Sequence, residues 1–368
     1  MSALAIAAVV AFASPAPPRP SDSATAEAST PKPATTKPTR LYADSQSIEV
    51  QTETVWRPMC GSSASQLDAA QLDQIAETLR TAEPNVAAVA DPEPTVDFEL
   101  TFNKSGTVPA EAAQALAEVE RYVESRFTNA VEVVVDVSFT PLPLNILGAT
   151  ANNFVLLDWS VVRDGLVAGM DGDDTIQDWL PGGATIPVRY NIFTDEVTDE
   201  NRVYVTFANH RAAIGSLKGN DGTMIFNSEL VWDYTPPDIG TEDDPEALSF
   251  QDVVVHEVAH ILGFSSGVDG PNNTGRPFDI ELLDIYRFQM TDGEGTNYNP
   301  DTLEEFTTTP RLADRGPSFP MNDDDVVSDL ISDEYRMSDG APSQASHFSA
   351  MFPKELLMDP FFAPGETF

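Results

Sequence analysis

The chain has 368 residues, of which 41% are hydrophobic, and this suits a folded protein of one large domain or two ordinary ones. Its 59 acidic residues outnumber 20 lysines and arginines, which gives a formal net charge of −39. A surface of that charge repels nucleic acid and anionic lipid, so we expect neither nucleic acid nor a membrane as a partner. The acids are spread along the whole chain, which favours adaptation to a salty medium, where ions screen their mutual repulsion.

Cysteine and histidine are both rare. The single cysteine, Cys60, allows no disulfide within the chain and excludes a structural zinc site built from cysteines. The four histidines are His210, His256, His260 and His347. His210 follows a predicted strand, and we interpret it as a structural or surface residue. The other three are candidates for one shared site.

The N-terminal part divides into three segments by composition. Residues 1–13 are apolar and end in Ala-Phe-Ala, which is typical of a secretory signal, although the basic start of such a signal is missing. Residues 14–45 are rich in Pro, Ser, Thr and Ala and are interpreted as a disordered linker. Residues 46–94 contain an amphipathic helix pattern and are predicted to be a pro-segment or small N-terminal subdomain. The sequence therefore predicts a secreted protein whose main domain spans residues 95–368.

The main domain alternates between strand and helix patterns. Residues 96–102 alternate between apolar and polar side chains, an amphipathic helix follows over 109–126, and residues 131–139 form a second strand. Strand, helix and strand over this length predict a βαβ unit. Further elements are expected as strands at 186–191, 203–208 and 223–228, helices at 250–262 and 278–289, and mostly irregular chain at 290–346. The predicted fold is α/β (α+β), with a twisted mixed sheet and a loop-rich C-terminal part.

One predicted helix carries the strongest chemical signal, the sequence HEVAH. Ser249 can cap the start of this helix and Gly263 can end it. His256 and His260 are four residues apart, so both lie on one face of the helix and can reach one metal ion. Glu257 is displaced around the helix and can reach a water molecule on the metal. Zinc lowers the pKa of bound water to about 7, so Glu257 is predicted to be the general base and later the proton donor to the leaving amine.

A catalytic zinc ion usually has three protein ligands and a water molecule, so the two histidines need a third partner. Three residues compete for this place. They are His347 near the C-terminus, Glu281 in the predicted helix 278–289, and Asp269 shortly after HEVAH. The spacing of the residues leaves these alternatives open.

The segment HEVAHILGF resembles the metzincin motif H-E-x-x-H-x-x-G-x-x-H, with Gly263 in the place of its glycine. The usual third histidine is replaced by Ser266, whose hydroxyl is a poor zinc ligand. In this respect the chain is similar to leishmanolysin-like metzincins, in which an insertion separates the glycine from the third histidine. His347, followed by Met358 in a Leu-Met-Asp-Pro segment, matches the order of third histidine and Met-turn in that family.

This resemblance implies a metzincin-like zincin domain in which His256, His260 and His347 hold zinc. It implies that Met358 packs beneath the site without binding the metal. It also implies that residues 223–228 form the edge strand that pairs with an extended substrate. The implied activity is hydrolysis of peptide bonds within a protein or peptide substrate.

Two alternative functions remain beside this interpretation. Glu281 as third ligand resembles the arrangement of gluzincins, which are also zinc peptidases. A secreted binding protein that kept the fold and lost catalysis is the other alternative.

Two further features of the sequence offer groups that can bind a metal ion. Asp171, Asp173 and Asp174 offer carboxylates to Ca²⁺, but their spacing does not fit an EF-hand, so an acidic solvated loop is the favoured interpretation. Cys60, in the segment RPMCG, resembles in composition the pro-segment cysteine that keeps some metzincins latent. The alternative for Cys60 is a small buried side chain.

Overall fold

The computed structural model describes residues 52–59, 97–144, 146–170, 176–191, 196–235, 247–269, 280–289, 300, 302–314, 326–328, 338, 345–347 and 358. The predicted signal segment, the linker, the N-terminal helix pattern, Cys60 and the aspartates at 171, 173 and 174 lie outside these residues. What was predicted for them therefore stays a prediction.

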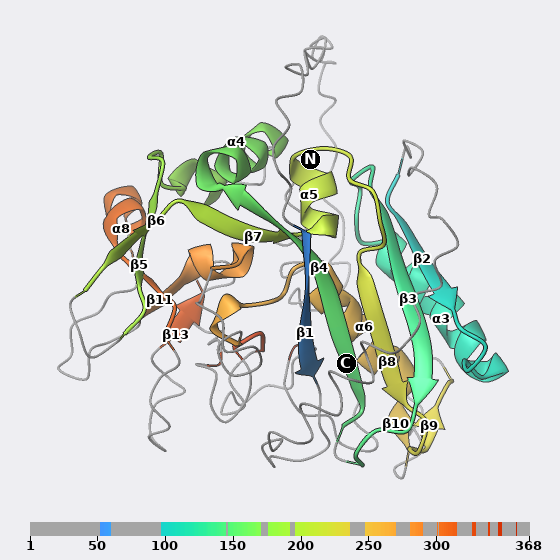
Figure 1. Ribbon diagram of the computed structural model, residues 1–368. Helices are drawn as coiled ribbons and strands as arrows, with labels where there is room; N and C mark the ends of the chain where they lie inside the picture. Colours follow the sequence, from blue (N-terminus) through green and yellow to red (C-terminus); the bar gives the residue numbers. More distant parts are fainter. Residues whose placement is uncertain are drawn as a thin grey trace, which may run out of the picture.

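A six-stranded mixed sheet forms the centre of the fold (Figure 1). Strands β2, β3 and β8 run parallel to one another, and β4 runs antiparallel to β8. On its other side, β4 pairs antiparallel with β1, while β7 pairs antiparallel with the later part of β4 on the same side as β8. The six strands are β1 (Thr52–Met59), β2 (Glu99–Lys104), β3 (Glu132–Thr140), β4 (Gly148–Asp158), β7 (Arg202–Thr206) and β8 (Gly222–Asn227).

Helices and three small sheets surround this sheet. The α-helices of the described residues are α3 (Ala110–Glu124), α4 (Trp159–Gly169), α5 (Phe207–Ala213), α6 (Phe250–Ile261) and α8 (Leu303–Thr308), and the 3₁₀ helices are η1 (Ile176–Trp179), η2 (Gly267–Asp269) and η3 (Leu282–Tyr286). The small sheets pair β5 (Ile186–Arg189) with β6 (Thr198–Glu200) and β12 (Arg311–Leu312), β9 (Trp232–Asp233) with β10 (Leu248–Ser249), and β11 (Arg287–Gln289) with β13 (Val326–Ser328). The predicted mixed α/β class is confirmed.

Helix α3 joins the parallel strands β2 and β3, so the predicted βαβ unit is confirmed. Pro109 is its N-cap, in an extended conformation that proline favours before a helix. The buried side chains of α3 recur at helical spacing and face the sheet. They are Ala112, Ala115, Leu116, Val119 and Val123. They share one hydrophobic core with β2, β3, β8 and α6, and in Figure 1 both helices lie behind the strands.

Helix α6 carries HEVAH through the interior of the protein, and all twelve of its residues are buried. Its first residue, Phe250, packs against Phe226, Trp232 and Phe139 at ring-centroid distances of 5.0, 5.5 and 5.6 Å. A buried phenylalanine contributes roughly 1.5–3 kcal/mol by burial alone, and each aromatic pair adds about 0.5–1.5 kcal/mol. This aromatic cluster fixes the start of α6 against β8 and β3.

Both ends of α6 follow the prediction. The Ser249 hydroxyl accepts a hydrogen bond from the Asp252 backbone N–H at 3.4 Å, which caps the first turn. After the helix, Gly263 has a φ of 104°, a left-handed conformation that glycine adopts without a steric penalty. The chain therefore turns sharply at Gly263.

Two predictions about elements were wrong. The strand at 223–228 is β8, and it lies between β3 and β4 rather than at an edge of the sheet. The position next to it is taken by β4, an antiparallel strand that the sequence analysis did not predict. Residues 278–289 were predicted to form one helix, but the described part is the short helix η3 followed by β11. Pairing of β11 with β13 holds Arg287–Gln289 in an extended conformation instead.

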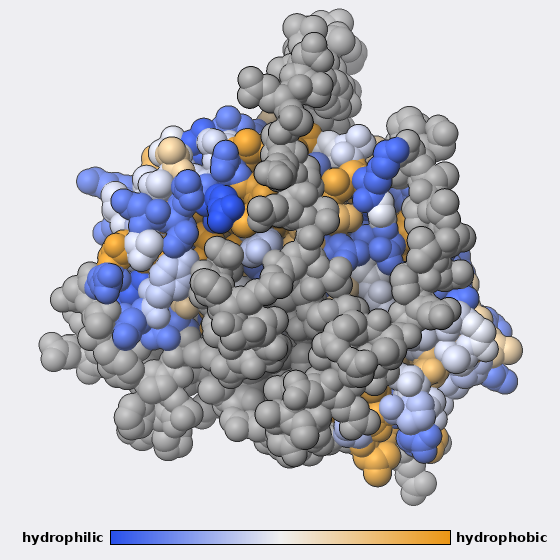
Figure 2. Space-filling view, in the orientation of Figure 1, coloured by the Kyte–Doolittle hydropathy of each residue, from blue (hydrophilic) through white to orange (hydrophobic). Residues whose placement is uncertain are grey.

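The described surface is largely polar. On the face drawn in Figure 2, hydrophilic side chains cover most of the coloured area, with smaller hydrophobic patches between them. In the part of the chain that the structure describes, no helix has the length and apolar character required to span a bilayer.

Candidate metal centre

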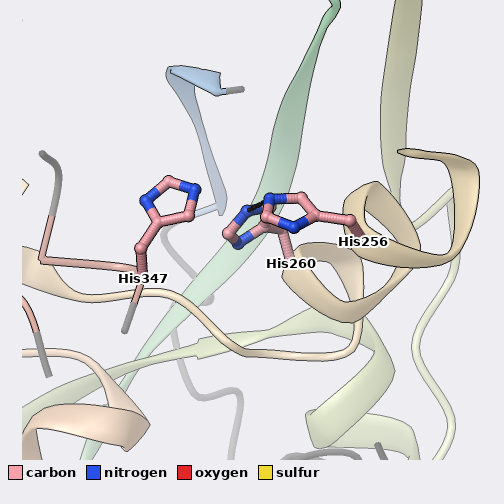
Figure 3. Close-up of side chains that lie close together, drawn as sticks. All are labelled: His256, His260 and His347. Carbon is pink, nitrogen blue, oxygen red and sulfur yellow. Dashed lines mark hydrogen bonds between the residues drawn. The ribbon is translucent and has the colours of Figure 1, made fainter. Parts of the chain in front are cut away.

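Three histidines from two distant parts of the chain come together beside α6. One ligand nitrogen from each of His256, His260 and His347 lies within 4.8 Å of the others, and all three residues are buried. The ring centroid of His347 is 5.2 Å from that of His256 and 5.1 Å from that of His260. Figure 3 shows His256 and His260 side by side on one helix, with His347 arriving from a separate segment. Among the described residues, this is the only such cluster that could hold a metal ion.

The spacing of the nitrogens fits a shared metal ion. Nε2 of His256 and Nε2 of His260 are 3.0 Å apart. Two nitrogens bound to one tetrahedral zinc ion, each at about 2.0–2.1 Å, lie about 3.3 Å apart. Three imidazoles suit zinc, and they also suit copper, iron and nickel. The donor set therefore fits a transition metal without selecting one.

The turn at Gly263 orients one of the ligands. Nδ1 of His260 donates a hydrogen bond to the carbonyl oxygen of Phe264 at 2.6 Å, because a carbonyl oxygen can only accept. The proton therefore sits on Nδ1 and Nε2 is left to bind metal. The backbone carbonyl of His260 accepts from the side chain of Asn152 on β4 at 2.7 Å. Strand and turn thus hold this histidine from both sides.

Glu257 points toward β4. It is fully buried (0% exposed), and its Oε2 accepts a hydrogen bond from the hydroxyl of Thr150. A Cβ atom added at Gly148 would lie 3.5 Å from its Oε1, so the carboxylate lies against the start of β4. Glu257 does not belong to the close group of ligand atoms. Its role as general base therefore stays a prediction.

Glu281 does not belong to the close group either. Its Oε2 accepts a hydrogen bond from the hydroxyl of Ser265 at 2.6 Å, and its backbone N–H donates to Asp284 at 2.9 Å. It also forms a backbone bridge to Tyr204 in β7. These contacts give Glu281 a structural role in the chain after α6. Asp269, the remaining alternative, lies in η2, and its side chain is outside the described part of the chain.

The remaining predicted residues are placed as follows. Met358 is buried, with 2% of its surface exposed, and its place beneath the metal stays a prediction. His210 lies in α5, where its Nδ1 donates to the carbonyl of Gly215 at 3.1 Å. Burial lowers the pKa of His210 below its ordinary value of 6.5, so burial favours its neutral form. It is not a member of the histidine cluster.

Thr150 and Asn152 were not identified from the sequence, although they contact Glu257 and His260. Both lie on β4, whose sequence GATANNFVLLD lacks a strict alternation of apolar and polar residues in its first half. Their contacts depend on the packing of β4 against α6, which no local sequence pattern predicts.

Comparisons of the chain with protein families, with curated proteins and with solved structures found no match. The geometry and the chemistry of the residues therefore carry the functional argument.

Proposed function

We propose that this protein is a secreted zinc-dependent endopeptidase with a metzincin-like catalytic domain. In this proposal His256, His260 and His347 hold zinc, and Glu257 is the general base. The observation that carries the proposal is the convergence of His347 with the two histidines of HEVAH. No local sequence spacing requires that convergence, and it supplies the three protein ligands that a catalytic zinc site uses.

Zinc held by His256, His260 and His347 would act as a Lewis acid toward a substrate carbonyl and would lower the pKa of bound water. The protein side chains supply proton transfer and orientation. Glu257 takes a proton from the attacking water and returns it to the leaving amine. The Thr150 hydroxyl orients the carboxylate by donating to Oε2, which leaves Oε1 on the side of Gly148. Because the site is buried, bulk water is kept from these charges, which strengthens their interactions.

The pairing of β1 with β4 supports an extended peptide as the substrate. Strand β1 pairs with β4 in antiparallel register from Thr52 opposite Val155 to Met59 opposite Gly148. An added strand on a sheet edge gains affinity from backbone hydrogen bonds, while pockets for its alternate side chains give specificity. A substrate in the same place as β1 would end beside Gly148 and therefore beside Glu257. We assign substrate pairing to β4 in place of the internal strand β8.

The test is hydrolysis of a denatured protein by the full-length chain. Chelation should abolish hydrolysis, and added zinc should restore it. Glu257→Gln should abolish hydrolysis while the zinc content stays at the wild-type level, and Glu304→Gln on the exposed surface of α8 should change neither. Full activity of Glu257→Gln, or activity that resists complete removal of metal, would contradict the proposal. Zinc binding without any hydrolysis would favour an inactive binding protein.

A further inference from the structure

A fully buried ion pair lies between α6 and the segment that carries His347. Asp284 in η3 and Arg287 at the start of β11 are both 0% exposed, with Arg287 Nη1 3.4 Å from Asp284 Oδ1. Ser266 lies between them: Arg287 Nη1 donates to its hydroxyl at 2.8 Å, and that hydroxyl donates to Asp284. Asp284 also accepts from the backbone N–H of Gly267 at 2.8 Å. The pair therefore holds the chain that follows the turn at Gly263.

The same network reaches the third histidine by two routes. Arg287 Nη2 donates to the carbonyl of Ser338 at 3.0 Å, and the Ser338 N–H donates to the carbonyl of His347 at 2.9 Å. Separately, the Ser266 N–H donates to the hydroxyl of Ser346 at 3.1 Å. One route ends on His347 itself and the other on the residue before it.

We propose that the Asp284–Arg287 pair, with Ser266, positions His347 as the third metal ligand. The inference rests on the proposed metal site and adds residues to it that do not touch the metal. His256 and His260 are set by one rigid helix, whereas His347 comes from a remote segment and needs a separate support. Polar groups behind a ligand fix its orientation, and their loss typically weakens metal binding about 10- to 100-fold.

The residue types fit this role. The guanidinium of Arg287 is a planar fork, so it donates to Ser266 and to Ser338 at the same time. Lysine would keep the charge but cannot span both acceptors with the same geometry. A buried ion pair adds little to stability compared with apolar side chains of similar volume. Its presence beside a ligand segment is therefore better explained by positioning than by stability.

The experiment measures zinc affinity of the folded protein by competition with a chromophoric chelator. Arg287→Lys and Ser346→Ala should each weaken zinc binding about 10- to 100-fold. Ser346→Ala removes one hydroxyl from a short side chain, so it keeps the test valid if Arg287→Lys does not fold. In a His347→Ala background, Ser346→Ala should cause no further loss, because its effect passes through His347.

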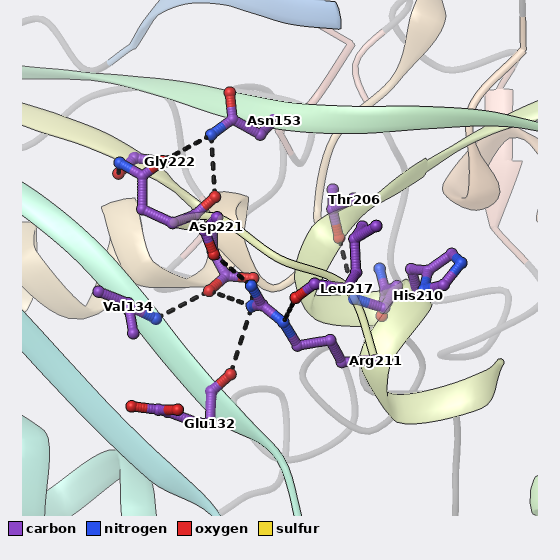
Figure 4. A network of polar contacts seen from close by, with 12 residues as sticks. Glu132, Val134, Asn153, Thr206, His210, Arg211, Leu217, Asp221 and Gly222 are labelled. Atoms are coloured by element: carbon purple, nitrogen blue, oxygen red, sulfur yellow. Dashed lines mark hydrogen bonds and ion pairs between the residues drawn. The ribbon is translucent and has the colours of Figure 1, made fainter. Parts of the chain in front are cut away.

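A second buried pair provides the matched control. Arg211 in α5 bonds to Asp221 just before β8, with side chains 6% and 0% exposed (Figure 4). Arg211 also donates to the carbonyls of Leu217 and Glu132, and Asp221 accepts from the N–H of Val134. None of these contacts involves a histidine of the cluster. Arg211→Lys should lower the unfolding midpoint in urea and leave zinc affinity unchanged.

The outcomes separate the two proposals. Weaker zinc binding in Arg287→Lys and Ser346→Ala, with Arg211→Lys at the wild-type affinity, supports the positioning role. Wild-type zinc affinity in Ser346→Ala overturns the positioning role, and so does a loss of zinc affinity in Arg211→Lys as large as that in Arg287→Lys. Neither result contradicts the proposed metal site. A wild-type protein that binds no zinc overturns the proposed function and the positioning role together.

Discussion

Thr150→Val tests how Glu257 is held. Threonine and valine are both β-branched and nearly equal in size, so the substitution keeps β4 packed and removes one hydroxyl. That hydroxyl donates to Glu257 Oε2, and the two residues are 2% and 0% exposed. A hydrogen bond to a charged group contributes about 1.5–3 kcal/mol. If loss of this hydrogen bond raises the free energy of the transition state by that amount, kcat/KM drops roughly 10- to 100-fold, since about 1.4 kcal/mol corresponds to a tenfold change in rate.

The assay is kcat/KM on a quenched fluorescent peptide, with zinc content measured on the same samples. Zinc content should not change, because Thr150 bonds to Glu257, the proposed general base, and not to a proposed ligand. Thr150→Ser is the matched control: it keeps the hydroxyl and loses one methyl group, which costs about 1 kcal/mol of stability. Its kcat/KM should remain close to wild type. A Thr150→Val protein with full zinc and wild-type kcat/KM would refute the claim that this hydroxyl orients Glu257.

Three further predictions concern charge and the N-terminal strand. With a net charge of −39, the melting temperature should rise from low to molar salt as screening removes self-repulsion, and a flat or falling value would count against salt adaptation. Burial raises the pKa of Asp221 from 3.8 to about 6, against the opposing effect of Arg211. Between pH 3.8 and about 6, the folded chain therefore holds a proton that the unfolded chain has lost. The contribution of Asp221 to the free energy of unfolding falls by roughly 3 kcal/mol as the pH rises through this range. The difference in unfolding free energy between wild type and Asp221→Asn should show this slope in urea titrations, and parallel curves would contradict it. Deletion of residues 1–94 removes β1 from its pairing with β4 and should raise peptidase activity. Unchanged activity after the deletion would show that β1 does not block the substrate. Cys60→Ala should raise peptidase activity only if the thiol keeps the chain latent.

Local patterns predicted the elements whose periodicity is strong. The β2–α3–β3 unit and α6 with its two caps follow the sequence closely, because each has a continuous apolar stripe or a clear capping residue. The edge position of residues 223–228 could not be predicted, because strand order depends on pairing between distant segments. The helix expected over 278–289 failed for a related reason: β11 is set by its partner β13.

The candidate site divides in the same way. His256, Glu257 and His260 follow from spacing on one helix. His347 was expected from a family resemblance, and the structure brings it to the other two. The supporting residues Thr150, Ser266 and the buried pair were not predicted, because they act through contacts between segments far apart in the chain and their types have many other uses.

The most direct test of the account is the zinc stoichiometry and affinity of His347→Ala compared with Glu281→Gln. Both residues are buried, with 2% and 3% of their surfaces exposed, so both variants alter the interior. We expect one zinc ion per wild-type chain, a large loss of affinity in His347→Ala, and near wild-type affinity in Glu281→Gln. Loss of zinc in Glu281→Gln with retention in His347→Ala would contradict the three-histidine site.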